Sequence, residues 1–144
     1  MTSSNKHSLN KGELAEEALR RYFLSLGFFV IRGVKFCFQG YTITDIDLWL
    51  YNKNSTLTRE IINVDVKRKR TPQAIERIFW TKGLQHAISC TRCVVVTTDK
   101  RPATKNFGEL LDVTVLDGTF LARLIENLRI ENRLTENDFL SILN

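Results

Sequence analysis

An acid and an amine lie two residues apart within residues 61–70, a stretch whose branched apolar residues predict a strand. Successive side chains of a strand point to opposite faces, so Asp65 and Lys67 share one face and their apolar neighbours take the other. Hard divalent cations prefer oxygen ligands, and an ammonium group neutralises charge on a phosphoryl group. The pair therefore suits a site for a divalent metal and a phosphate. Taken alone, the same spacing also fits an exposed edge strand with an incidental ion pair.

A second strand supplies further acids. Residues 43–51 alternate between apolar and polar side chains, with Asp45 and Asp47 on the polar face. The polar loop of residues 52–58 predicts a hairpin, which makes the two strands antiparallel neighbours. Asp47 and Asp65 then lie close together across the sheet, where like charges repel unless a cation lies between them. Asp45 shares the face of Asp47 and is the alternative ligand.

A helix predicted over residues 13–26 contributes another acid. Its apolar residues recur at helical spacing, and Gly27 follows its end. On the helical wheel Glu16 lies at the margin of the apolar face, whereas Glu13 and Glu17 point nearly away from it. If one of these acids reaches a site inside the fold, we expect it to be Glu16. Compensation of the helix dipole is the alternative explanation for all three acids.

A second helix, predicted over residues 71–89, opens with Thr71 and Pro72 after the basic run. Arg77, Lys82, Gln85 and His86 are candidates for a side that faces either the site or solvent. Gln85 could orient a nucleophilic water or touch a phosphate, although a helical glutamine is more often a surface residue.

The remaining patterns complete the fold. Strands are predicted at residues 28–38, with Gly33 as a bulge or turn, and at 93–98 and 113–116. Gln39 and Gly40 predict a turn, and Asp117 can cap a helix over residues 119–130. Short helices are predicted at 105–111 and from Thr135. This order predicts an α/β fold, a three-layer α/β/α sandwich around a mixed central sheet, formed by a single domain over residues 1–144 with 1–11 flexible.

Composition narrows the possible partners. The chain has 144 residues, 43% of them hydrophobic, with a formal net charge of +5 and a pI of about 9.3. Much of the positive charge is concentrated in one part of the sequence. Such a basic region favours binding to a polyanion, most often nucleic acid, and a basic surface that contacts only solvent is the alternative. The candidate nucleic-acid-binding residues are Arg68, Lys69, Arg70 and Lys82. No signal peptide or membrane-spanning run is apparent, so we expect a soluble cytoplasmic protein without a membrane partner. Cys37, Cys90 and Cys93 lack zinc-site spacing and are expected to be reduced thiols in or near the core.

These residues together resemble a known family. Glu16 on a first helix, Asp47 within Ile46-Asp47-Leu48, and Asp65-Val66-Lys67 after a short hairpin resemble the PD-(D/E)XK nuclease superfamily, which has the restriction-endonuclease-like fold. Residues 11–32 are similar to the start of archaeal Holliday-junction resolvases. Residues 94–121 are more similar to the catalytic domain of Mrr-type restriction enzymes. The resemblance covers most of the chain, and it favours Asp47 over Asp45 because Ile46 and Leu48 flank it as in the family pattern.

The resemblance implies roles for individual residues. Asp47 and Asp65 would bind Mg²⁺ or Mn²⁺, with the Val66 carbonyl as a further ligand and Glu16 completing the metal site. Lys67 would position or activate the attacking water and stabilise the transition state, and Gln85 matches an extra helical glutamine of several branches. The expected reaction is metal-assisted hydrolysis of phosphodiester bonds in DNA, in restriction, repair or recombination. RNA remains an alternative substrate.

Other functions remain open. The first alternative is a DNA-binding or assembly subunit that keeps the nuclease fold without cutting, and the second is a basic α/β domain that contacts protein. The set of acids favours the nuclease, because acids beside a polyanion repel phosphate when no metal is present. Since nucleases of this type usually cut two strands with two active sites, we expect a homodimer. No target-recognition domain is apparent, so specificity would come from loops, a dimer or a partner protein.

Overall fold

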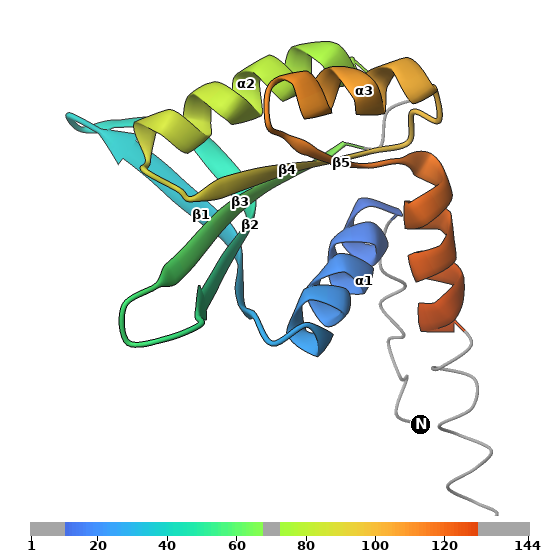
Figure 1. Cartoon of the computed structure of the whole chain (residues 1–144), viewed down its shortest axis with the longest axis horizontal. Coiled ribbons are helices and arrows are strands. Elements are labelled where there is room, and N and C mark those ends of the chain that lie inside the picture. Colours follow the sequence, from blue (N-terminus) through green and yellow to red (C-terminus); the bar gives the residue numbers. More distant parts are fainter. Residues whose placement is uncertain (1–10, 68–72, 130–144) are drawn as a thin grey trace, which may run out of the picture.

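The computed structural model describes residues 11–67 and 73–129. In this part of the chain, four helices pack on a five-stranded mixed open sheet (Figure 1). The elements follow in the order α1 (Lys11–Ser25), β1 (Phe29–Phe38), β2 (Tyr41–Lys53), β3 (Arg59–Lys67), α2 (Ala74–Ala87), β4 (Arg92–Thr97), α3 (Pro102–Leu110), β5 (Thr114–Leu116), and a last helix whose described part is residues 118–129. The predicted α/β class and mixed sheet are confirmed.

The strands lie in the sheet in the order in which they occur in the chain. β1, β2 and β3 form an antiparallel meander, and β4 and β5 are added in parallel beyond β3. The predicted antiparallel pairing of the Asp47 and Asp65 strands is confirmed by the β2–β3 ladder. The parallel pairs require crossovers, which α2 and α3 supply.

Helices cover both faces of the sheet. α1 and the last helix lie on one face, and α2 and α3 lie on the other (Figure 1). On the first face, Leu19 and Phe23 of α1 pack with Leu48, Val64 and other apolar side chains of the central strands. On the second face, a smaller cluster joins Ile78 of α2 to side chains of β4 and β5. The alternation of β3 thus directs Val64 to the α1 face and leaves Asp65 for the α2 face.

Local details test the predicted turns and bulge. Gln39 and Gly40 have positive φ angles of 48° and 82° and form the predicted two-residue turn between β1 and β2. Gly33 also has a positive φ of 65°, but the register shift of the β1–β2 ladder lies between Phe36 and Cys37. The prediction of a bulge at Gly33 was therefore displaced by three residues, because an unusual φ can be accommodated without adding a residue to the strand.

Helix boundaries differ from the predictions by up to three residues. The Asp117 carboxylate accepts a hydrogen bond of 3.0 Å from the Phe120 N–H, as a capping residue does. α3 begins at Pro102, three residues before the predicted start, since proline suits the first turn of a helix. α2 begins at Ala74, after the non-helical Gln73, three residues later than predicted. The predictions for residues 1–10 and for the last short helix from Thr135 lie outside the described residues.

The cysteines differ in their burial. Cys90 and Cys93 are buried free thiols as predicted, and burial raises the pKa of each to about 11. Cys37 is exposed, because it lies near the end of the edge strand β1, so the prediction that it lies in or near the core was wrong. Within the described residues, no helix is long and apolar enough to cross a membrane.

Candidate active site

Asp47 lies where the pairing of β2 with β3 ends. The β2–β3 ladder ends at the Leu48–Val64 pair, and the Asp47 carboxylate accepts a hydrogen bond of 2.7 Å from the Val66 N–H. On the other side, Gly33 stands opposite Asp47, between the Arg32–Leu48 and Val34–Ile46 pairs. The side chain of Asp47 therefore takes over a bond that a strand normally makes with its backbone.

The charges around Asp47 shift its ionisation. Burial is the largest cause that raises the pKa of Asp47, and the charges of Asp65 and Glu16 raise it further. The Val66 N–H and the charge of Lys67 act in the opposite direction. Asp47 thus interacts electrostatically with each of the other predicted charged groups, Glu16, Asp65 and Lys67. A cation bound among them would relieve the repulsion between the carboxylates.

Asp65 is held by an arginine of α2. The Arg77 guanidinium donates from Nε to Oδ2 at 2.9 Å and from Nη2 to Oδ1, so that both oxygens of Asp65 are engaged. The side chain of Asp65 is 12% exposed and that of Arg77 is 26% exposed. These hydrogen bonds are the largest cause that raises the pKa of Arg77 above its ordinary value. The guanidinium also lies 5.7 Å from the centroid of the Trp80 ring, within range of a cation–π contact.

The role of Arg77 was not assigned from the sequence. The helical pattern left Arg77 facing either the site or solvent, and the structure brings it to the site. No spacing rule joins Arg77 to Asp65, because the connection between β3 and α2 separates them. Its position beside the buried Ile78 was the available signal, since a residue next to the apolar stripe of a helix lies near the sheet.

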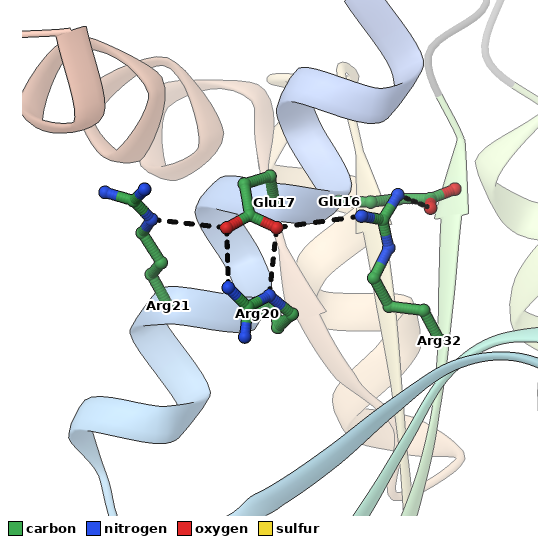
Figure 2. A network of polar contacts seen from close by, with 5 residues as sticks. All are labelled: Glu16, Glu17, Arg20, Arg21 and Arg32. Atoms are coloured by element: carbon green, nitrogen blue, oxygen red, sulfur yellow. Dashed lines mark hydrogen bonds and ion pairs between the residues drawn. The ribbon is translucent and has the colours of Figure 1, made fainter. Parts of the chain in front are cut away.

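Glu16 belongs to a polar network on α1 (Figure 2). Arg32 of β1 lies between the two glutamates, 2.9 Å from Glu16 and 3.6 Å from Glu17. Arg20 and Arg21 also bind Glu17, and the hydrogen bond from Arg20 is the main reason why the pKa of Glu17 falls to about 2. The Glu17 side chain is 16% exposed and that of Glu16 is 29% exposed. Glu17 was predicted to point away from the fold, but the three arginines cover it.

Gln85 lies at the opposite end of the sheet. Its amide Nε2 donates to the backbone carbonyls of Cys90 and Thr91, at 3.3 and 3.1 Å. The Thr91 N–H in turn bonds to the Ile61 carbonyl, four residues before Asp65 along β3. Those four residues span about 13 Å of extended strand. The structure therefore does not bring Gln85 to the acids, and the geometry gives its side chain a role in closing the α2–β4 turn.

The remaining candidates fall in four groups. Lys67 is partly buried, and its charge acts on Asp47. Lys82 is partly buried, and its charge acts on Cys93 of β4. Asp45 is exposed and stands opposite Lys35 on β1, so Asp47 is the acid of β2 that contacts β3. Arg68, Lys69 and Arg70 lie outside the described residues.

The chemistry of the donor groups suits a hard divalent cation. Asp47 and Asp65 offer carboxylate oxygens, and the Val66 N–H bond to Asp47 keeps the Val66 backbone beside them. In the described part of the chain, no three acidic, histidine or cysteine side chains are gathered closely enough to hold a metal ion. Arg77 occupies both oxygens of Asp65, which a metal ion would need. Asp47 and Asp65 can therefore bind a cation together once the cation replaces Arg77 at Asp65.

Comparison with protein families, with curated proteins and with solved structures finds no match for the chain.

Proposed function

We propose that the chain is a metal-dependent DNA endonuclease with the restriction-endonuclease-like, three-layer α/β/α fold. The observation that supports this most is the hydrogen bond from the Val66 N–H to Asp47, which brings the carboxylate of β2 to the strand that carries Asp65 and Lys67. Concentrated acids beside a lysine suit a site where a cation and a phosphate meet. A site that bound only a polyanion would gain nothing from the carboxylates.

Each residue has a distinct task in this proposal. Asp47 and Asp65 bind Mg²⁺ or Mn²⁺ together with the Val66 carbonyl, and Glu16 completes the site directly or through water. When bound, the cation polarises the scissile phosphate and lowers the pKa of a bound water. Lys67 orients that water and stabilises negative charge on the phosphate as it develops. The Val66 N–H fixes the carboxylate of Asp47, so that this ligand is oriented before the substrate arrives.

We also propose that the active form is a homodimer. Four aromatic side chains on the β1–β2 hairpin and α2, Phe38, Tyr41, Phe79 and Trp80, are 47–75% exposed. Together they expose about 500 Å². Phe36 and Ile43 of the hairpin and Trp80, Gly83 and Leu84 of α2 line an apolar groove of about 300 Å³ beside them. A stable interface needs about 800 Å² from each partner, so this surface supplies much of one.

The surface is best covered by a second copy of the chain. The end of the β1–β2 hairpin extends outward from the sheet (Figure 1), and it carries Phe38 and Tyr41. The groove beside α2 is a recess. A two-fold axis lets each copy insert its protrusion into the recess of the other, which is a self-complementary contact. Light scattering after size exclusion tests this arrangement. We expect a dimer that Phe79→Asp converts to a monomer, while Leu57→Asp, at an exposed loop residue elsewhere, stays dimeric. A monomeric parent chain would contradict it.

A non-cleaving DNA-binding subunit is the second candidate. The Arg77–Asp65 pair favours it, because a carboxylate permanently held by arginine has no free oxygen for a metal. The two candidates differ in one measurable property, which is cutting that depends on a divalent cation.

A cleavage assay separates the candidates. The purified chain is incubated with supercoiled, linear, single-stranded and four-way-junction DNA, with Mg²⁺, with Mn²⁺ and with EDTA. For a nuclease, cutting requires the cation, and Asp65→Ala and Lys67→Ala each reduce it by at least about 100-fold. Asp45→Ala is the matched control, because Asp45 is an exposed acid two residues from Asp47, and this variant should cut normally. Tight binding to DNA without cutting by any form would leave the binding subunit as the better explanation.

A further inference from the structure

Arg77 engages the group that the proposed cation would need. Its guanidinium spans both oxygens of Asp65, and this two-point geometry is the strongest form of arginine–carboxylate contact. Both side chains are largely buried, so water replaces little of the interaction. A metal ion and the guanidinium are both positive and approach the same oxygens. They therefore compete for Asp65.

Arg77 has other interactions available when it leaves Asp65. The ring of Trp80 already lies within cation–π range of the guanidinium. The charge of Asp47 also acts favourably on Arg77. An arginine with alternative contacts close by can release a carboxylate by rotating its side chain, without crossing the site.

We propose that Arg77 is a positioning residue that holds Asp65 in the absence of metal and is displaced from it when a divalent cation binds. The guanidinium pairs with both oxygens of Asp65, and the negative charge of Asp47 also attracts it. Metal affinity is consequently lower than the ligands alone would give, because binding must first break the Arg77–Asp65 contact. This inference rests on the proposed metal site.

Direct measurement of metal binding tests the inference. Mn²⁺ is titrated into the DNA-free protein, and the free ion is followed by its electron paramagnetic resonance signal. Arg77→Met removes the guanidinium while keeping much of the side-chain length, and we expect it to bind Mn²⁺ about tenfold more tightly than the parent chain. Arg77→Lys retains the charge but cannot span both oxygens, so its affinity should lie between the two. Circular dichroism verifies that each variant is folded, and Arg77→Lys carries the test if Arg77→Met is not.

The control is a second arginine with the same kind of contact. Arg101 donates from Nε to both oxygens of Asp99 and from Nη2 to Oδ2, and Asp99 follows β4, whereas Asp47 and Asp65 lie on β2 and β3. Arg101→Met should therefore leave Mn²⁺ affinity unchanged. Thermal unfolding gives a further readout, because added Mn²⁺ should raise the melting temperature of Arg77→Met more than that of the parent chain.

The possible outcomes separate this inference from the proposed function. If the parent chain binds Mn²⁺, Asp65→Asn does not, and the Arg77 variants bind as the parent does or more weakly, the metal site stands and the displacement of Arg77 is overturned. If the Arg77 variants bind Mn²⁺ and the parent chain does not, the inference is supported in its strongest form. Absence of binding in every protein would overturn both.

Discussion

The carboxylate of Asp47 accepts the Val66 N–H at 2.7 Å, at the position where the β2–β3 ladder stops. A side chain thus continues the hydrogen bonding of the sheet by one bond beyond its last backbone pair. The bond holds Asp47 in a partly buried position, and burial raises its pKa. The same group therefore stabilises the strand end and carries charge at a place where charge is unfavourable.

Two substitutions of Asp47 separate these effects. Asp47→Asn keeps a carbonyl oxygen that can accept the Val66 N–H, whereas Asp47→Ala leaves this N–H without its partner. We expect Asp47→Ala to lower the free energy of unfolding by about 1–3 kcal/mol and Asp47→Asn to lower it by less. Urea unfolding without metal at pH 7 measures both. Equal losses in the two variants would show that the Val66 bond contributes little.

The Asp99 carboxylate should make the fold less stable in acid than at neutral pH. Hydrogen bonds from Arg101 are the main cause that lowers the pKa of Asp99 from its ordinary 3.8 to about 2, with the Thr104 hydroxyl assisting. A carboxyl group whose pKa is lower in the folded than in the unfolded chain stabilises the fold at pH values above its unfolded pKa. This stabilisation is lost as the pH falls from about 4 to 2. Because Arg101 is mostly exposed, solvent screens the pair, and we expect only a small loss of the free energy of unfolding.

The Asp99 contribution is measured by urea unfolding between pH 2 and pH 6. Asp99→Asn should lose stability relative to the parent chain at pH 6 and converge with it near pH 2. Glu17→Gln provides a comparison, since the pKa of Glu17 is also lowered to about 2 by arginine contacts. A constant difference between Asp99→Asn and the parent across this range would mean that its charge is not involved.

Gln85 is expected to matter for stability and not for the site. Gln85→Ala removes two hydrogen bonds to the turn before β4, which should cost about 1 kcal/mol in urea unfolding. Affinity for Mn²⁺ should be unchanged, because the turn lies at the far end of β3 from Asp65. His86→Ala is the control at the neighbouring exposed position. A weakened Mn²⁺ affinity in Gln85→Ala would restore the catalytic role expected from the sequence.

Alanine substitutions at two glycines should change the stability of the fold in opposite directions. A Cβ on Gly118 would lie 2.4 Å from the Thr98 carbonyl oxygen, which belongs to the backbone and cannot rotate away. Gly118→Ala should therefore lower the free energy of unfolding by about 1–3 kcal/mol. Gly83 lies within α2, where a Cβ would meet open space, so Gly83→Ala should raise stability by about 0.5–1 kcal/mol. Thermal unfolding of the two variants provides the measurement, and a stabilised Gly118→Ala would contradict the close approach.

Much of the fold follows from local patterns in the sequence. The alternation in residues 43–51 and 61–67 identified two strands, and the polar loop between them gave their antiparallel pairing, because both signals act over short distances. These signals also brought Asp47 near Asp65. Helical spacing selected Glu16 from three neighbouring acids; the structure pairs Glu16 with Arg32 at 2.9 Å, and its role in a metal site stays a prediction.

The contacts that were missed depend on how distant elements pack. Arg77 contacts Asp65 only because α2 packs at a particular position along β3, and no spacing in the sequence specifies that position. The same placement moves Gln85 to the other end of β3. Glu17 is covered because Arg32 of β1 reaches over α1, so its burial depends on a contact between two elements. The pattern of one helix cannot predict such a contact.

α2 is attached by hydrogen bonds at three points along its length: at Arg77 through Asp65, at the Thr81 carbonyl through Asn63 of β3, and at Gln85 through the turn before β4. A translation of the helix along its own axis would stretch all three attachments, so they fix its axial position. Release of Arg77 alone would leave the attachments at Thr81 and at the Gln85 end intact. The helix could then tilt slightly about that end but not slide, and Phe79 and Trp80 would keep their height above the sheet. Events at Asp65 would therefore reach the exposed aromatic surface of α2 as a small change of angle.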